Sequence, residues 1–396
     1  MTARVRALQA LFFAAYGTTI PYLAIYYGRV LADSNGVPNY AAVGTILSIS
    51  TLVGLVSPLV AGYLADRFRI NNRLITVLAL LVVVGAIGMF LPGSGLFSDI
   101  GFALRFAVLF AGSIVNGLFV RPIIPLIDTE TLLVLRGRDG TIERYGEVRA
   151  FGAIGWCVTA SLSGVYIAIV GRMEHLIIFY ASILLILAAV GRTGFRSTIS
   201  AVRIPWSHLR DDKTFQRFLV FVALIALGMV PGYVFAGVYF SELDLNFVMI
   251  GLAFGLASTP EIPVLLNGRR IVSRIGSENM IIAGTTVQFI KFALLFLIAG
   301  TKIPFLFVLV MLLQGAGYSL QFAGFVDFMD RRAHEHLRAT YQSLYHVVFS
   351  IGGAIGNFAA AWFTGIASAR FVMALSGMCV GVAAIYFVLF VRSNHR

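Results

Sequence analysis

The chain has 396 residues, a net charge of +12 and a mean hydropathy of +0.90. Hydrophobic residues make up 59% of it and charged residues only 12%, whereas soluble domains carry about a quarter charged residues. This composition excludes a protein with a fully water-exposed surface and predicts an integral membrane protein in contact with the lipid bilayer. A basic excess is also typical of nucleic-acid binding, but the distribution of the charges explains it without a nucleic-acid partner.

Counting apolar runs in chain order predicts twelve spans of the length that crosses a bilayer. They lie near 7–29, 40–64, 74–92, 102–126, 147–170, 174–192, 215–240, 247–268, 279–300, 304–326, 338–366 and 370–391. The apolar part of the first run is about 22 residues, too long for the core of a signal peptide, so we expect it to be the first span.

A polar segment divides these spans into two sets of six. We therefore expect an all-α membrane protein with an N-terminal six-helix bundle at 1–192, a cytoplasmic central loop at 193–214 and a C-terminal six-helix bundle at 215–396. This 6 + 6 arrangement is typical of secondary transporters with a central cavity.

The basic residues gather on one predicted side of the membrane. Twenty-two of the 30 lysines and arginines fall in the segments that share a side with the N-terminus. Cytoplasmic segments carry this excess, so both termini are expected in the cytoplasm.

Ionisable residues inside predicted spans are functional candidates, because a charge in the hydrocarbon region is costly. Asp128 and Arg149 lie on consecutive antiparallel spans, at depths that differ by only about 5 Å. We expect them to form an ion pair, with Trp156 two turns deeper as a stacking plate for a polyhydroxyl ring. Arg121, two turns before Asp128, either joins this site or neutralises Asp128 through water.

A second group of charges lies in the predicted C-terminal bundle. Glu261 has Pro260 and Pro263 beside it, which weaken the local helix and free backbone carbonyls for a cavity. We expect Glu261 to carry a proton. Lys291 is offset from it by about 9 Å in depth, so it is less easily paired with Glu261 and finds another partner, while tuning the proton affinity of the carboxylate.

The segment GYLADR at 62–67, with Arg69 and Arg73 behind it, resembles the loop 2–3 signature of the major facilitator superfamily. Gly62 lets two helices approach and Asp66 accepts from a neighbouring helix N-terminus or an arginine. The resemblance implies a cluster that holds the cytoplasmic side shut in the outward-open state. The family usually has glycine where Arg69 stands.

More narrowly, the chain resembles the lactose-permease-like sugar:proton symporters and the nucleoside:proton symporters. FFAAYGTTIPYLAIYY (12–27) is similar to their aromatic first helix, which includes Tyr22, and GEVRAFGAIGW (146–156) resembles the segment with the sugar-binding arginine and tryptophan. Asp128 falls where the sugar permeases have a glutamate that pairs with this arginine. Glu261, SRIGSEN (273–279), Lys291 and LRATYQSL (337–344) are similar to the nucleoside group.

Span 10 departs from both groups. It reads LLQGAGYSLQF (312–322), with Gln314 near the histidine of the sugar permeases and Ser319 where the nucleoside group has an aspartate. The substrate therefore does not carry over, and Glu261 or Asp128 must couple protons.

These observations predict a proton-coupled secondary transporter of a small polar solute such as a sugar, glycoside or nucleoside, in a bacterial inner membrane. The alternatives are an organic-anion carrier or exporter, and a non-transporting receptor or lipid-handling protein. No P-loop, metal cluster or nucleophile motif occurs, so we expect no enzymatic activity and no cofactor besides the proton gradient. A monomer is expected by analogy.

The expected site residues fall into three groups. The substrate-binding residues are Asp128, Arg149, Trp156, Arg121, Gln314 and Tyr22, the proton-coupling residues are Glu261, Lys291 and Asp128, and the gating residues are Gly62, Asp66, Arg67 and Arg73.

Overall fold

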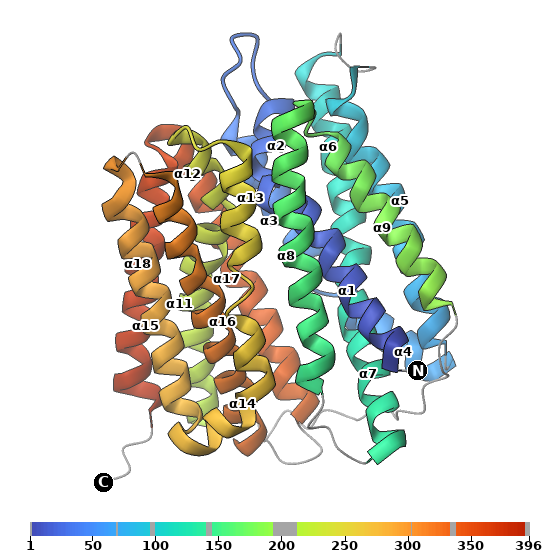
Figure 1. Ribbon diagram of the computed structural model, residues 1–396, viewed down its shortest axis with the longest axis vertical. Helices are drawn as coiled ribbons and strands as arrows, with labels where there is room; N and C mark the ends of the chain where they lie inside the picture. Colours follow the sequence, from blue (N-terminus) through green and yellow to red (C-terminus); the bar gives the residue numbers. More distant parts are fainter. Residues whose placement is uncertain are drawn as a thin grey trace.

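The computed structural model describes residues 2–68, 70–95, 100–139, 145–192, 212–301, 303–332 and 338–392. Within these residues the secondary structure is helical, apart from one β-bridge between Ala32 and Pro38. Figure 1 shows long helices running side by side, with both chain ends at the same side of the molecule. We call this the terminal side and the opposite one the far side. Most of the expected central loop lies outside the described residues.

The first half of the chain contains nine α-helices in the described residues. They are α1 (Thr2–Thr19), α2 (Leu23–Val30), α3 (Tyr40–Val53), α4 (Ser57–Phe68), α5 (Asn71–Phe90), α6 (Phe102–Val120), α7 (Ile123–Asp139), α8 (Tyr145–Val170) and α9 (His175–Gly191). A short 3-10 helix, η1 (Ile20–Tyr22), joins α1 to α2.

The described part of the second half contains eight. They are α11 (Lys213–Val234), α12 (Ala236–Glu242), α13 (Phe247–Leu256), α14 (Glu261–Ile275), α15 (Ser277–Leu297), α16 (Pro304–Arg332), α17 (Arg338–Ile366) and α18 (Ala369–Tyr386). Several begin at a polar residue whose side chain accepts from the third amide beyond it, as at Asn246 and Ser368.

Taken by length and composition, eleven helical segments of the described residues are suited to crossing a membrane. A further apolar helix, α9, is 17 residues long. The first span is longer than expected, because its helix begins at Thr2 instead of near residue 7 and runs to Val30. The helix α17 coincides with the eleventh expected span, 338–366.

Several spans are broken where the sequence predicts continuous helices. The first is interrupted by η1, which contains Pro21, and the fourth is interrupted at Arg121 and Pro122 between α6 and α7. The second is interrupted at 54–56 and the eighth just before Glu261. Proline removes an amide donor and clashes with the preceding turn, and each break frees backbone groups inside the protein.

The two halves of the chain meet mainly along three helix pairs. α8 packs on α13 and α14, and α3 packs on α17. Small residues allow the close approach, since a Cβ at Gly164 would overlap the Phe247 carbonyl and a Cβ at Gly44 would overlap Ala361. On the far side, Ser48 also donates to the Ala354 carbonyl at 2.9 Å. The halves are therefore in tight contact on the far side.

On the terminal side the contact is one-sided: α8 and α14 pack closely there, since a Cβ at Gly146 would overlap the Leu265 carbonyl, whereas α4 and α17, as far as the structure describes them, do not. α4 continues α3 toward that side, yet within the described residues no packing comparable to that of α3 joins it to α17. A Cβ added at Gly62 of α4 would meet no atom within 4 Å. The expected close helix contact at Gly62 is thus absent in this conformation, because α4 and α17 stand apart where it lies.

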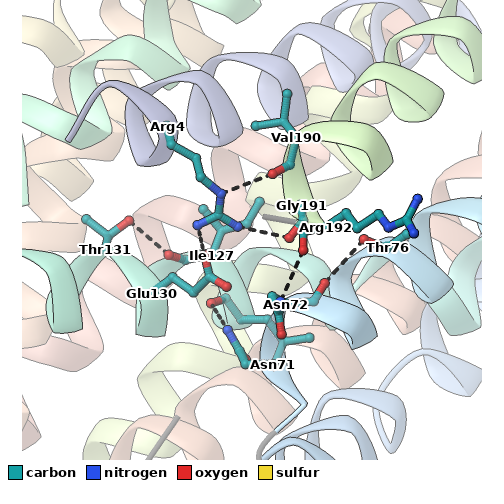
Figure 2. Close-up of polar contacts among 11 residues, drawn as sticks. Arg4, Asn71, Asn72, Thr76, Ile127, Glu130, Thr131, Val190, Gly191 and Arg192 are labelled. Atoms are coloured by element: carbon teal, nitrogen blue, oxygen red, sulfur yellow. Dashed lines mark hydrogen bonds and ion pairs between the residues drawn. The ribbon is translucent and has the colours of Figure 1, made fainter. Parts of the chain in front are cut away.

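Arg4 joins three helices near the terminal side (Figure 2). Its guanidinium donates to the Val190 and Gly191 carbonyls at the end of α9, both at 3.0 Å, and forms a 2.6 Å ion pair with Glu130 of α7. An arginine at a helix C-terminus satisfies carbonyls that lack an intrahelical partner. This cluster fixes α1, α7 and α9 relative to one another.

Candidate functional site

Asp128 and Arg149 lie near each other, but a third residue stands between them. Gln9 of α1 donates from Nε2 to Asp128 Oδ1 at 2.6 Å and accepts from Arg149 Nη1 at its Oε1 at 3.1 Å. The Tyr145 hydroxyl also hydrogen-bonds to Asp128, and Arg149 lies 4.0 Å above the Phe13 ring centroid. This arrangement corrects the expected direct ion pair: the amide satisfies both charges, with its two ends matched to their opposite signs.

Arg149 also faces the second half of the chain. Its helix α8 packs on α14, which begins at Glu261. Glu261 packs beside Gly315, where a Cβ would come within 3.2 Å of its Cγ. A cation of one half and a carboxylate of the other therefore lie on two helices in contact, and any attraction between them depends on whether Glu261 carries a proton.

Trp156 lies two turns beyond Arg149 on α8, as expected. Its indole Nε1 donates to the Phe254 carbonyl of α13 at 3.0 Å, and its ring lies 6.4 Å from the Tyr233 ring. In this conformation its polar atom therefore joins the two halves of the chain.

Lys291 contacts Gln314 and not Glu261. It is 1% exposed, and its Nζ lies 2.5 Å from the Gln314 Oε1 and 3.5 Å from the Phe292 ring centroid. Gln288 donates to the Gln314 carbonyl at 3.0 Å, and its own Oε1 is buried without a partner. Lys291 thus has its partner on the neighbouring helix of the same half. Gln314, expected in the substrate site, is the residue that satisfies this cation.

Tyr22 lies within the packed far side. It is 1% exposed, and its hydroxyl donates to the Ala160 carbonyl of α8 at 3.0 Å. This position makes it a contact between η1 and α8 in the conformation described.

The expected gating residues lie at the end of α4 and the start of α5. Arg67 is exposed, donates to the Tyr63 hydroxyl and lies over the Tyr63 and Phe68 rings. Arg73 is exposed as well. The side chain of Asp66 and the whole of Arg69 lie outside the described residues.

A cavity of about 220 Å³ lies between the two halves, next to the breaks in the first, second and fourth spans. Its walls come from α1, η1, α2, α3, α5, α6 and α9 of the first half and from α11 and α17 of the second. Most of the lining is apolar. The polar part includes Arg121, Tyr16, Asn116, Ser50 and Asn357.

Arg121 is the charged residue of this cavity, and it stands at the break between α6 and α7. Its side chain lies against Gly54, at the break between α3 and α4. Among the expected substrate-binding residues, only Arg121 lines this cavity; Asp128 and Arg149 belong to the Gln9 cluster.

Several residues of the site have no charge and were therefore missed by a search for ionisable residues. Gln9 is 0% exposed and begins the uncharged part of α1, and Asn357 is 3% exposed on α17. A lone amide in an apolar span is a usable signal, because a buried amide needs hydrogen-bond partners. Gly54 carries no comparable signal, since its role depends on the neighbouring helix.

Comparison with known proteins agrees with this architecture. The model of the MFS_1 like family matches residues 4–375. A maltose permease of Geobacillus stearothermophilus is 25% identical over 364 residues, which cover 89% of this chain and 83% of the permease. A putative nucleoside transporter of Escherichia coli, YegT, is 25% identical over 321 residues, 76% of this chain and 71% of that protein.

Solved structures show the same fold. The nucleoside transporter NupG superposes with a TM-score of 0.77 at 17% identity, covering 99% of both chains. A D-xylose-proton symporter superposes with a TM-score of 0.71 at 14% identity, covering 100% of this chain and 98% of that one. Because the family model spans nearly the whole chain, this protein belongs to the MFS_1 like family and is a membrane transporter of the major facilitator type.

Proposed function

We propose that the chain is a proton-coupled secondary transporter that moves a small polar solute by alternating access. The observation that carries this proposal is a pair of opposite charges in spans of the two halves, Arg149 on α8 and Glu261 at the start of α14, on two helices that pack on each other. Such charges are costly in a bilayer and mark ion or solute pathways. The solute class, a sugar, glycoside or nucleoside, is supported by the names of the maltose permease, the nucleoside transporters and the xylose symporter.

The architecture that we propose has twelve spans in two bundles of six. α9, at 17 residues, would be the sixth span, and the bundles would comprise residues 1–192 and 215–396, joined by the loop at 193–214. The helix packing supports this division: α1 packs on α8 and α9, and α11 packs on α17 and α18. Alternating access then consists of one bundle rocking against the other.

The conformation described would be the one open toward the terminal side. The far side is joined at Gly44, Ser48 and Gly164, whereas Gly62 faces open space. The positive-inside distribution supports a cytoplasmic position for the terminal side, in a bacterial inner membrane. In the opposite state α4 would approach α17, with Gly62 at their crossing.

Proton binding couples to this motion through the α8–α14 contact. With Glu261 ionised, its attraction to Arg149 favours contact between the two halves. A proton on Glu261 removes that attraction, so Arg149 becomes free to bind solute hydroxyls together with Asp128. Lys291 and Gln314 would determine the polarity of the interior of the second half. The contacts that Trp156 and Tyr22 make at the boundary between the halves would break when the halves separate. A ligand shifts such an equilibrium only by its differential affinity for the two states.

Transport in proteoliposomes tests the proposal. Sugars, nucleosides and small organic acids are offered with an imposed pH gradient, and accumulation and exchange are measured separately. Glu261→Gln should abolish uphill accumulation while retaining exchange, whereas Glu174→Gln, at a turn on the far side, should behave as the unchanged protein. Equal accumulation by Glu261→Gln would exclude Glu261 as the proton carrier and leave Asp128→Asn as the next variant.

Two alternatives have distinct outcomes in the same assay. Uptake of organic acids without uptake of neutral solutes would indicate an organic-anion carrier. Movement of the solute only out of the vesicle interior would indicate an exporter. The absence of flux for every solute, in the unchanged protein and in Arg149→Ala alike, would favour a receptor or lipid-handling protein.

A further inference from the structure

We propose that the cavity beside Arg121 is a binding subsite for the anionic group of a small hydroxylated solute, either a carboxylate or a phosphate. The inference rests on the proposed transport function and deepens it by naming the charge of the solute. It is separate from the Gln9 cluster around Arg149, which does not line this cavity.

The first observation is that Arg121 has no partner. Within the described residues no hydrogen bond or ion pair reaches its guanidinium, and its electrostatic neighbour is the neutral hydroxyl of Tyr16. Other cations inside the helices differ in this respect: Arg4 has Glu130, Arg149 has Gln9, and Lys291 has Gln314. A charge buried without a counter-charge is strongly unfavourable, so an anion that enters the cavity gains this interaction.

The second observation is the placement of Arg121 at two helix breaks. The α6–α7 break holds its backbone and the α3–α4 break receives its side chain, where a Cβ on Gly54 would overlap its Cδ and Nε. Glycine at position 54 therefore lets the arginine stem lie between the two spans. The side chain is confined in this way, and Arg121 is one of the residues that line the cavity.

The third observation is a free acceptor in the opposite wall. Asn357 of α17 lines the same cavity and is 3% exposed, and its Oδ1 is buried without a hydrogen-bond partner. A buried acceptor without a donor is unfavourable, and a solute hydroxyl would satisfy it once the amide turns toward the cavity. In the first half, Asn116 donates from its side-chain Nδ2 to the Tyr180 hydroxyl at 2.9 Å. Its side-chain oxygen can therefore accept from another donor.

These groups together select the ligand chemistry. A planar guanidinium binds two oxygens of a carboxylate or phosphate at once, and the amide oxygens accept from hydroxyls. The cavity volume of about 220 Å³ is below the range of about 300–1,000 Å³ that is common for ligand sites, so it limits the solute to a small molecule. A hydroxylated acid of monosaccharide size fits this combination. Because Arg121 belongs to the first half and Asn357 to the second, such a solute would contact both.

Equilibrium binding to the purified protein tests the subsite. The probes are gluconate for a carboxylate, glucose 6-phosphate for a phosphate and glucose as the neutral counterpart. We expect at least one anionic probe to bind more tightly than glucose, and Arg121→Gln to weaken it about 10- to 100-fold while changing glucose binding less than about twofold. Arg121→Lys should give an intermediate loss, since it keeps the charge without the planar fork.

Arg331→Gln is the matched control, because it removes one positive charge from a side chain that is 63% exposed and far along α16. It should bind all three probes as the unchanged protein does. If Arg121→Gln and Arg331→Gln weaken anion binding equally, or if neither anion binds the unchanged protein more tightly than glucose, the subsite is refuted. A loss confined to gluconate or to glucose 6-phosphate identifies the anionic group.

Failure of the proposed function has a different signature. Anion binding that depends on Arg121, without flux of any probe in proteoliposomes, would support the subsite and contradict transport of these solutes. Proton-driven flux of glucose that is unaffected by Arg121→Gln, with no preference for the anions, would support transport and contradict the subsite.

Discussion

The side chain of Arg121 lies across Gly54, so that a Cβ at position 54 would overlap both the arginine side chain and the Gly117 carbonyl. This contact joins the breaks of two spans, one between α3 and α4 and one between α6 and α7. It shows how a backbone position without a side chain determines where a cavity charge lies.

Replacing Gly54 should therefore alter both packing and the cavity. Gly54→Ala is expected to destabilise the protein by about 1–3 kcal/mol, because the Gly117 carbonyl is backbone and must shift. Thermal unfolding in detergent measures this change. Gly268→Ala is the control: its added methyl meets no atom within 4 Å and should be neutral or stabilising. Equal destabilisation by both would show that the close approach of Gly117 and Arg121 to position 54 does not matter.

Gly62 provides a test of the opposite conformation. Gly62→Leu adds a side chain where this conformation has open space, so its stability should change by less than about 0.5 kcal/mol. If α4 must approach α17 during the cycle, the same variant should lose most of its transport. Parallel measurement of thermal stability and proteoliposome flux checks the prediction. Normal flux would mean that position 62 stays open throughout.

Lys291 and Gln314 should respond asymmetrically to mutation. Gln314→Leu leaves the buried ammonium without its acceptor and should destabilise the protein by about 1–3 kcal/mol or more. Lys291→Met removes the charge at similar volume but leaves the Gln314 Oε1 without its donor, so it should cost less than Gln314→Leu, because the group left unpaired is neutral. Combining the two should recover the stability lost in Gln314→Leu alone. A double variant as unstable as the sum of the single effects would contradict an interaction between the two residues.

The Arg4 cluster should contribute more than its counterpart in the second half. Arg4→Gln leaves Glu130, which is 2% exposed, without its cation, and we expect a loss of about 3–5 kcal/mol. Arg217 makes a similar contact, donating to the Phe390 carbonyl at 3.3 Å, but it is exposed and has no carboxylate partner among the described residues. Arg217→Gln should change the unfolding free energy by less than about 1 kcal/mol. Similar losses in chemical denaturation would indicate that burial of the ion pair is unimportant.

The sequence by itself determined the class of protein and most of its spans. A run of about 20 apolar residues satisfies its backbone only as a helix in a bilayer, so hydropathy alone locates such helices. The expected eleventh span and α17 coincide for this reason. The loop 2–3 motif and the spacing around Arg149 indicated the superfamily, which the family model confirms.

Only the tertiary structure decided the partners of the buried polar groups. Sequence distance put Asp128 and Arg149 at similar depths, but the insertion of Gln9 depends on how α1 packs on α7 and α8. In the same way, the sequence does not show whether a charged residue inside a span has a hydrogen-bond or ion-pair partner in the folded protein. Among the described residues Arg121 has no hydrogen-bond or ion-pair partner whereas Lys291 has one, because helix breaks and rotations set which side chains meet across helices that are distant in the chain.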